Sequence, residues 1–319
     1  TVSSVTSTTS NGSYKVDEVI AITVTFSEAV TVNTTNGTPQ LTLETGSSDA
    51  VVNYSSGTGG TTLTFNYTVA SGHTSSDLDY ASTSALALNS GTIKDAAGNA
   101  ATLTLATPGQ SNSLAANKAL IVDTTVPTIS SVNSTASNGT FKIDDVIPIK
   151  ITFSEAVTVS GTPQLTLETG TSDAVVNYAS GSGSVELIFN YTVASTHVSD
   201  DLDYKATNSL ALNSGSINDA AGNAATLTLA SPGATNSLSA NKALVIDGVV
   251  ATVSSVTSTV SDDTYKLNDV IPVAITFSEA VTVTGTPQLT LETGSSDAVV
   301  NYSSGSGSNT LTFNYTIAM

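Results

Sequence analysis

The stretch IAITVTF, residues 20–26, decides the fold of this chain. Apolar residues (Ile, Ile, Val, Phe) alternate in it with small or polar ones (Ala, Thr, Thr). Successive side chains of a β-strand point to opposite faces, so this period of two predicts a strand with one buried face. The pattern returns at residues 147–153 and 271–277. The structural unit that contains this strand therefore occurs three times in the chain.

The neighbourhood of the strand is repeated as well. The segment TPQLTLETG starts at Thr38, Thr162 and Thr286, which are 124 residues apart (162 − 38 and 286 − 162). The segment DAAGNAATLTLA starts at Asp95 and again at Asp219. A unit of this length matches a whole small domain rather than a short solenoid repeat. We predict three tandem domains: residues 1–125, residues 126–249 and, without its second half, residues 250–319.

Other short segments of the first unit also alternate, and turn residues separate them. Besides 20–26, the expected strands are 1–8, 40–44, 50–54, 63–69, a short strand within 77–90, one at Leu103 and Leu105, and 119–123. No segment has the period of an amphipathic helix. About seven to nine short strands per unit, with frequent turns, indicate an all-β fold made of tandem Ig-like antiparallel β-sandwich domains.

Two details refine this expectation. Pro148 and Pro272 fall early in two copies of the 20–26 strand. Proline has no N–H to donate, so we expect the strand to begin there or to lie at a sheet edge. The linkers, residues 123–128 and 247–252, are too short for the domains to tumble independently. A row of stiffly coupled domains is therefore expected.

Composition excludes several functional classes. The 319 residues include 8 basic and 26 acidic ones, with no arginine, for a formal charge of −18. This balance excludes nucleic-acid binding and argues against docking on anionic lipid. No run approaches the roughly 18–20 apolar residues of a membrane helix, so we expect no direct insertion of this segment into a membrane. The absence of cysteine excludes disulfides, thiolate catalysis and Cys-based zinc sites.

The chain resembles the bacterial immunoglobulin-like repeats of giant adhesins and other long repetitive surface proteins. The resemblance rests on the segments VDTTVPT, ITVTFSEAV, IKDAAGNA and ALIVDTT. The resemblance implies an extracellular location at the bacterial cell surface. It also implies an extender that holds a separate binding tip away from the cell. In several such families calcium ions stiffen the domain junctions, which here points to Asp123 and Asp247. The second junction departs from the pattern, with Gly248 and Ala251 where the first has Thr and Pro, so equal stiffness is not expected.

Acidic residues recur at matching positions, as calcium ligation requires. The candidate calcium ligands are Asp17 and Asp144, Glu28 and Glu155 (with Glu279), Asp95 and Asp219, and Asp123 and Asp247. Calcium takes about six to eight oxygen ligands, mainly carboxylates and carbonyls. If Glu28 and Asp95 lie at the pole from which Asp123 leaves the domain, the three share one cage. The alternative is structural: Asp95 makes an Asx-turn before Gly98, Asp123 ends a strand, and the other acids are solvated.

An enzymatic function has little support in the sequence. His73 and His197 occupy matching positions, and so do the carboxylate pairs Asp77/Asp79 and Asp201/Asp203. Paired carboxylates serve glycosidases, but residues two apart in an extended segment are neighbours on one face without any catalytic purpose. No set of nucleophile, base and orienting group appears. We predict that the protein is not an enzyme.

The aromatic residues raise one further alternative. Tyr54, Tyr67 and Tyr80 are suited to form a face on which sugars stack, although the inward alternation of Tyr67 makes it a core residue. The sequence thus favours a non-enzymatic extender of an adhesin-like protein, whose partners are the neighbouring repeats. The first alternative is a subunit of a filament, sheath or surface layer, assembled from identical chains by strand complementation or end-to-end contacts. The second is a repeated carbohydrate-binding module.

Overall fold

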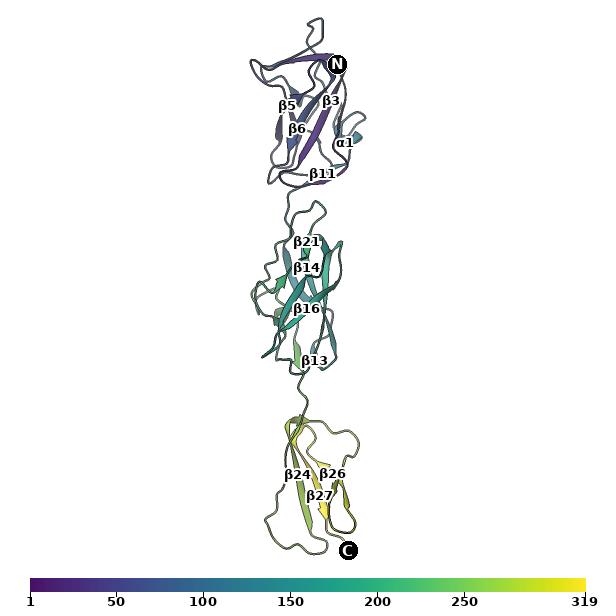
Figure 1. Ribbon diagram of the computed structural model, residues 1–319, viewed down its shortest axis with the longest axis vertical. Helices are drawn as coiled ribbons and strands as arrows, with labels where there is room; N and C mark the ends of the chain where they lie inside the picture. The colour runs from purple at the N-terminus through teal and green to yellow at the C-terminus, as the bar shows by residue number, and fades with distance from the viewer.

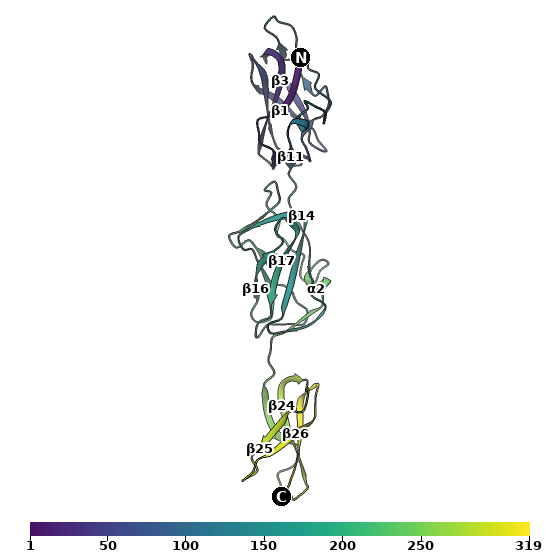
Figure 2. The ribbon, with the colours of Figure 1, turned by 90° about the vertical axis from the view of Figure 1, so that its right-hand side faces the viewer.

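The computed structural model describes residues 1–319 as three bodies in a row (Figure 1). The view turned by 90° shows the same row, with the two termini at opposite ends (Figure 2). Each body has a core of its own, with 23 buried apolar residues in the first, 22 in the second and 4 in the third. The chain is thus organised as two full domains and a partial one.

Each full repeat consists of eleven strands and one short helix. The first contains β1 (Val2–Ser7), β2 (Gly12–Tyr14), β3 (Val19–Asn33), β4 (Gln40–Glu44), β5 (Ala50–Ser56), β6 (Gly60–Thr68), β7 (Thr74–Ser75), β8 (Asp79–Tyr80), β9 (Leu86–Ala87), β10 (Thr92–Lys94), α1 (Leu114–Asn117) and β11 (Leu120–Asp123). The second contains β12 (Ile129–Ser134), β13 (Gly139–Lys142), β14 (Val146–Ser160), β15 (Gln164–Glu168), β16 (Ala174–Ser180), β17 (Ser184–Thr192), β18 (Val198–Ser199), β19 (Asp203–Tyr204), β20 (Leu210–Ala211), β21 (Ser216–Asn218), α2 (Leu238–Asn241) and β22 (Leu244–Asp247). The third contains β23 (Val253–Ser258), β24 (Val270–Val281), β25 (Gln288–Leu291), β26 (Ala298–Ser304) and β27 (Ser308–Thr316).

Curled sheets enclose the core of each full repeat. In the first, the larger sheet has the order β1-β3-β6-β5-β4-β8, with β10 paired to β3 and β9 to β4. The smaller sheet has the order β2-β11-β7. All of these pairs are antiparallel except β2 with β11, which run parallel. The second repeat has the same order, so the predicted all-β, Ig-like architecture is confirmed.

Strand β3 carries the predicted alternation and connects the parts of the repeat. Its inward residues Ile20, Ile22 and Val24 have no exposed surface. Burying one such side chain contributes about 1.5–3 kcal/mol relative to leaving it exposed. The first half of β3 lies between β1 and β6, and its end pairs with β10 through Val32 and Ile93. One strand therefore spans the repeat from pole to pole.

Two expectations about secondary structure were wrong. The segment around Leu103 and Leu105 forms no strand. Leu105 is buried, but its backbone makes an isolated hydrogen bond to Thr83 O (2.9 Å) instead of a ladder. The helix α1 was not expected, because a single turn is too short to show a helical period. Its start is stabilised by Ser113, whose hydroxyl accepts a bond from Ala116 N.

Of the two alternatives expected at Pro148, the strand does begin close to the proline, but it does not lie at a sheet edge. Strand β14 lies between β12 and β17, and Pro148 is its third residue. The pairing of β12 with β14 ends at Ser134 and Ile149. Pro148 lies one residue beyond this end, so β12 needs no N–H from it. At the matching place in the first repeat, Ala21 N donates to Thr9 Oγ1 at 2.9 Å. The sequence is consistent with this geometry, because Ala136 and Val260 replace the threonine in the two repeats that have proline.

A double-mutant cycle tests this pairing. Thr9→Ala leaves the N–H of Ala21 without its partner and should lower the free energy of unfolding of the first repeat by about 1 kcal/mol. Adding Ala21→Pro removes the N–H and reproduces the combination of the second repeat, so most of that loss should be recovered. Urea unfolding of the four variants measures the coupling. Two independent, additive losses would contradict this explanation.

Candidate functional site

The turn at residues 219–223 (DAAGN) stands at the end of the second repeat that faces the first. Asp219 accepts two hydrogen bonds from Asn223, one from its backbone N (2.8 Å) and one from its side-chain Nδ2 (2.7 Å). Gly222 has a φ of +87°, which favours glycine and lets the turn close. The local sequence therefore builds a rigid turn with a carboxylate in it.

The first repeat holds this turn by direct contacts. Asn223 Nδ2 also donates to Asp123 O, at 2.9 Å. Lys15 Nζ, from the far side of the linker, donates to Gly222 O at 2.9 Å. The two repeats thus contact each other through polar groups on both sides of the linker.

The identical turn of the first repeat shows what the junction changes. Asp95 and Asn99 make the same two hydrogen bonds, 2.8 and 2.7 Å long, and these bonds lower the pKa of Asp95. Asn99 is exposed, whereas Asn223 is only 8% exposed. The turn is therefore preformed by its own sequence, and the preceding repeat buries it.

Three carboxylates from three separate segments meet at the junction. Asp123 ends β11 of the first repeat, Glu155 lies in β14, and Asp219 follows β21. One oxygen of each lies within 4.8 Å of the others. Glu155 Oε1 is buried and has no hydrogen-bond partner. Burial, followed by the charges of Asp123 and Asp219, raises the pKa of Glu155.

This donor set fits a hard divalent cation. Calcium–oxygen distances are about 2.3–2.6 Å, so two ligands of one ion lie up to about 5 Å apart. The spacing of 4.8 Å satisfies that limit. A cation there would also give Glu155 Oε1 the partner that it lacks. All donors are carboxylate oxygens, which suit calcium better than a soft metal.

The structure corrects the grouping predicted from the sequence. Asp123 does not meet Glu28 and Asp95 of its own repeat. These two line a small hollow at the opposite pole, next to Thr1. The reason is the direction of β3, which starts at the pole of Asp123 and carries Glu28 to the other one. Asp123 instead meets the matching pair of the next repeat, Glu155 and Asp219.

The remaining predicted ligands lie apart from this cluster. Asp17 and Asp144 occupy left-handed positions (φ 71°) in the turns that precede β3 and β14. Asp247 ends β22 at the second junction. Glu279, the counterpart of Glu155, likewise has a buried Oε1 without a partner. The position matching Asp219 lies past Met319, so the second junction is not complete within these residues.

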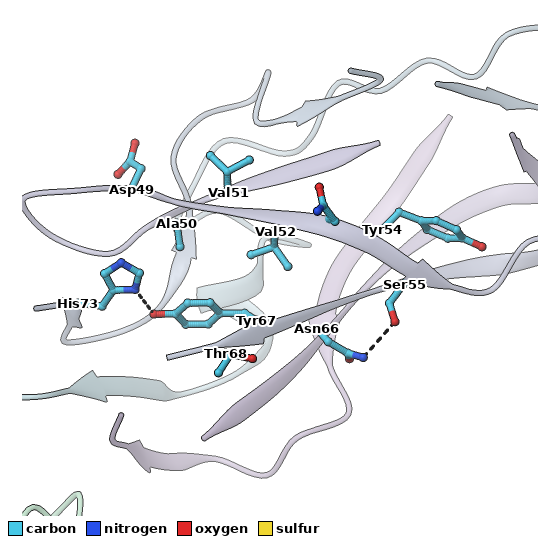
Figure 3. Close-up of a pocket in the computed structure, with 11 residues that line it drawn as sticks. Asp49, Ala50, Val51, Val52, Tyr54, Ser55, Asn66, Tyr67, Thr68 and His73 are labelled. Carbon is cyan, nitrogen blue, oxygen red and sulfur yellow. Dashed lines mark hydrogen bonds between the residues drawn. The ribbon is translucent and has the colours of Figure 1, made fainter. Parts of the chain in front are cut away.

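The histidines and the tyrosines have structural contacts (Figure 3). His73 Nδ1 is 2.8 Å from the hydroxyl of Tyr67, and the two rings stack. Tyr67 and Tyr80 are 2% and 1% exposed, and burial raises the pKa of each to about 12. Tyr54, which lines an open groove together with Tyr67 and His73, is half-buried. The predicted core position of Tyr67 is confirmed.

The carboxylate pair Asp77/Asp79 does not share a face, contrary to expectation. Asp77 is exposed and Asp79 is only 7% exposed. Asp79 accepts hydrogen bonds from Tyr80 N and Gly109 N, both 2.9 Å long. Its counterpart Asp203 makes the matching contacts in the second repeat. Both buried aspartates therefore stabilise loops, by accepting hydrogen bonds from Gly109 in the first repeat and Gly233 in the second.

The fold and the junction define a tandem array of Ig-like domains with polar contacts between neighbours. Residues 1–108 match the family model described as Bacterial Ig-like domain, and the first repeat therefore belongs to that family. The second repeat shares its motifs and strand order. Neither the curated proteins nor the solved structures gave a match. Domains of this family are generally non-enzymatic and typically exposed on the bacterial surface. No helix here has the length and apolar character to cross a membrane.

Removing the ammonium of Lys15 should loosen the first junction. Lys15→Met loses the bond to Gly222 O, so the angle between the repeats should vary more widely. Lys142→Met is the matched control, because its side chain is 82% exposed and pairs only loosely with Asp145 of the same repeat, at 3.9 Å. The chain has no cysteine, so spin labels at Ser48→Cys and Ser180→Cys report the distance across the junction. Equal distance distributions for both variants would argue against a role of Lys15.

Proposed function

We propose that this chain is a segment of the stalk of a large, adhesin-like bacterial surface protein. In this proposal the repeats are non-enzymatic extenders that hold another part of the protein away from the cell. The observation that carries it is the meeting of Asp123, Glu155 and Asp219 between two repeats, supported by direct polar contacts. A junction built from both neighbours restricts bending, and a row of such junctions makes a rod.

Calcium is the proposed cofactor of this junction. Asp123, Glu155 and Asp219 would hold it, and the ion would offset their charges and link the two repeats. Without it, three carboxylates within 4.8 Å repel one another, and one buried oxygen has no partner. We expect the repeats to separate or swing when the ion is removed.

The two junctions are expected to differ in stiffness. Thr124 Oγ1 fixes the first linker by donating to His73 O (3.0 Å) and accepting from Gly72 N (3.1 Å). At the second junction the backbone of Gly248 replaces the hydroxyl of Thr124, because Gly248 N donates to His197 O at 2.8 Å. A side chain at Gly248 would come within 2.3 Å of Ala194 O. Both linkers are anchored, but only the first contains a proline, whose fixed φ adds stiffness.

The two alternatives have less support. A carbohydrate-binding module needs an exposed aromatic face, and of the three candidate tyrosines only Tyr54 is even half-exposed. A filament or surface layer needs regular contacts between chains. Electron micrographs separate these cases, because a stalk forms separate thin rods and a polymer forms filaments with a regular subunit repeat.

The test of the proposal is small-angle X-ray scattering of the chain in calcium and in a chelator, with calorimetry to count bound ions. We expect a longer, stiffer particle in calcium. Asp219→Asn should abolish most of this response and remove one bound ion. The matched control is Asp95→Asn, which changes the same motif away from the junction. Unchanged scattering and no calcium binding would overturn the calcium proposal, and equal effects of both variants would overturn the assignment of the site.

Calcium binding should also weaken at acid pH. The pKa of Glu155 is raised in the folded chain. The folded chain therefore binds this proton more tightly than the unfolded chain does. The stabilising contribution of that proton is fully present below the ordinary pKa of glutamate and is lost as pH rises through the raised value. A proton therefore competes with calcium at higher pH than at an ordinary glutamate. Titrations at pH 5 and pH 7 should show weaker binding at pH 5, and Glu155→Gln should reduce this difference.

A further inference from the structure

The dipeptide Asn-Gly occurs three times in the chain, at residues 11–12, 36–37 and 138–139. This dipeptide is prone to spontaneous deamidation, because glycine has no side chain to keep its backbone N away from the preceding side-chain amide. All three asparagines are exposed. Exposure and local sequence therefore do not distinguish the three sites, whereas their hydrogen bonds do.

Two of the sites are held by the last segment of their own repeat. Asn11 Oδ1 accepts a bond from Ala119 N (3.2 Å), and Gly12 N donates to Ala119 O (3.1 Å). The second repeat makes the same two bonds, with the same lengths, between residues 138–139 and Ala243. Both glycines also begin strands, β2 and β13, which pair with β11 and β22. Attack by the glycine N on the asparagine side chain requires this pairing to open.

Asn36 lies instead in the loop between β3 and β4. The side-chain amides that make hydrogen bonds in and around this loop are those of Asn33 and Asn89, and Asn36 makes none. The backbone N of Gly37 makes one long bond, 3.3 Å, to Thr34 O in the same loop. Opening this third site therefore disturbs no pair of strands.

The packing of the loop requires the glycine that makes Asn36 reactive. A Cβ on Gly37 would lie 1.9 Å from Asn89 O, so any other residue would displace the backbone there. The matching places in the other repeats read Ser160-Gly161 and Thr284-Gly285, without an asparagine. Only the first repeat thus carries an Asn-Gly pair that no strand pairing restrains.

We propose that Asn36 is a site of spontaneous deamidation, which changes the first repeat with time. The backbone N of Gly37, after losing its proton to solvent, attacks Cγ of Asn36 and closes a succinimide ring. The Cγ–Nδ2 bond breaks, and Nδ2 takes up protons from water and leaves as ammonia. Water then opens the ring at either carbonyl, which gives aspartate or its β-aspartyl isomer. Nothing is oxidised or reduced, and water is the only co-reactant.

Both products place a new carboxylate in the loop, and the β-aspartyl product also lengthens the backbone by a methylene group. Gly37 packs closely against Asn89 O, and Asn89 Nδ2 donates to Thr38 O at 3.2 Å. A longer backbone displaces these contacts, so older molecules carry a looser loop in the first repeat. This inference rests neither on the proposed stalk nor on calcium.

The test is to incubate the folded chain at pH 7 and at pH 9 and to follow the three sites by peptide mass mapping. Cleavage after lysine places them in separate peptides, residues 1–15, 16–94 and 119–142. Two hydrogen bonds must open at each of the other sites, so Asn36 should deamidate about thirtyfold faster than Asn11 or Asn138. The rate at Asn36 should rise with pH, because the attacking N is deprotonated. A methyltransferase specific for β-aspartyl residues should label the same peptide.

The unfolded chain is the control for local sequence. In guanidinium chloride the three sites should react at similar rates, because the dipeptide is the same and the strand pairing is gone. Asn36→Gln should abolish the fast reaction and leave the two slow sites unchanged, since glutamine would have to close a larger ring. Equal rates at the three sites of the folded chain, or a faster reaction at Asn11 or Asn138, would overturn the proposal. A fast reaction that persists in the Asn36→Gln chain would overturn it as well.

Discussion

The burial of one side of β3 is the constraint on which the rest of each repeat depends. Because Ile20, Ile22 and Val24 must face the core, the strand has one register and one direction. That direction places the turn before it, with Lys15, at the exit of the repeat, and Glu28 near its end at the entrance. In the next repeat β14 places Lys142 and Glu155 in the same way. The two ends of one hydrophobic strand thus lie at two successive junctions.

The junction combines groups that attract with groups that repel. The bonds from Lys15 and Asn223 hold the two repeats together and keep the turn at 219–223 in place. The carboxylates brought together by that arrangement repel one another, and burial, followed by the charges of Asp123 and Asp219, raises the pKa of Glu155. Like charges at such short range are stable only with a proton or a cation nearby. This geometry is the basis of the proposal that calcium stiffens the junction.

Within each repeat, uncharged and lysine side chains connect the first and last segments, whereas carboxylates gather at the junction between repeats. The polar side chains of Asn117 and Lys118 bind backbone carbonyls about 110 residues earlier in the chain, and the parallel pair β2–β11 continues this connection. The first and last segments are thus fastened directly to each other rather than only through the core. Hydrogen bonds thus connect the two ends of each repeat, and further hydrogen bonds connect the first repeat to the second.

The sequence by itself determined the class of fold, because alternation with a period of two and the recurrence of whole segments are local properties. It also identified the recurring acids, since their chemistry is visible without coordinates. It did not determine which of them meet. Asp123 was grouped with Glu28 and Asp95, but strand direction takes those two residues to the far pole, and the true neighbours, Glu155 and Asp219, belong to the next repeat. Only the tertiary structure decided this, because a contact between poles depends on the path of every strand between them.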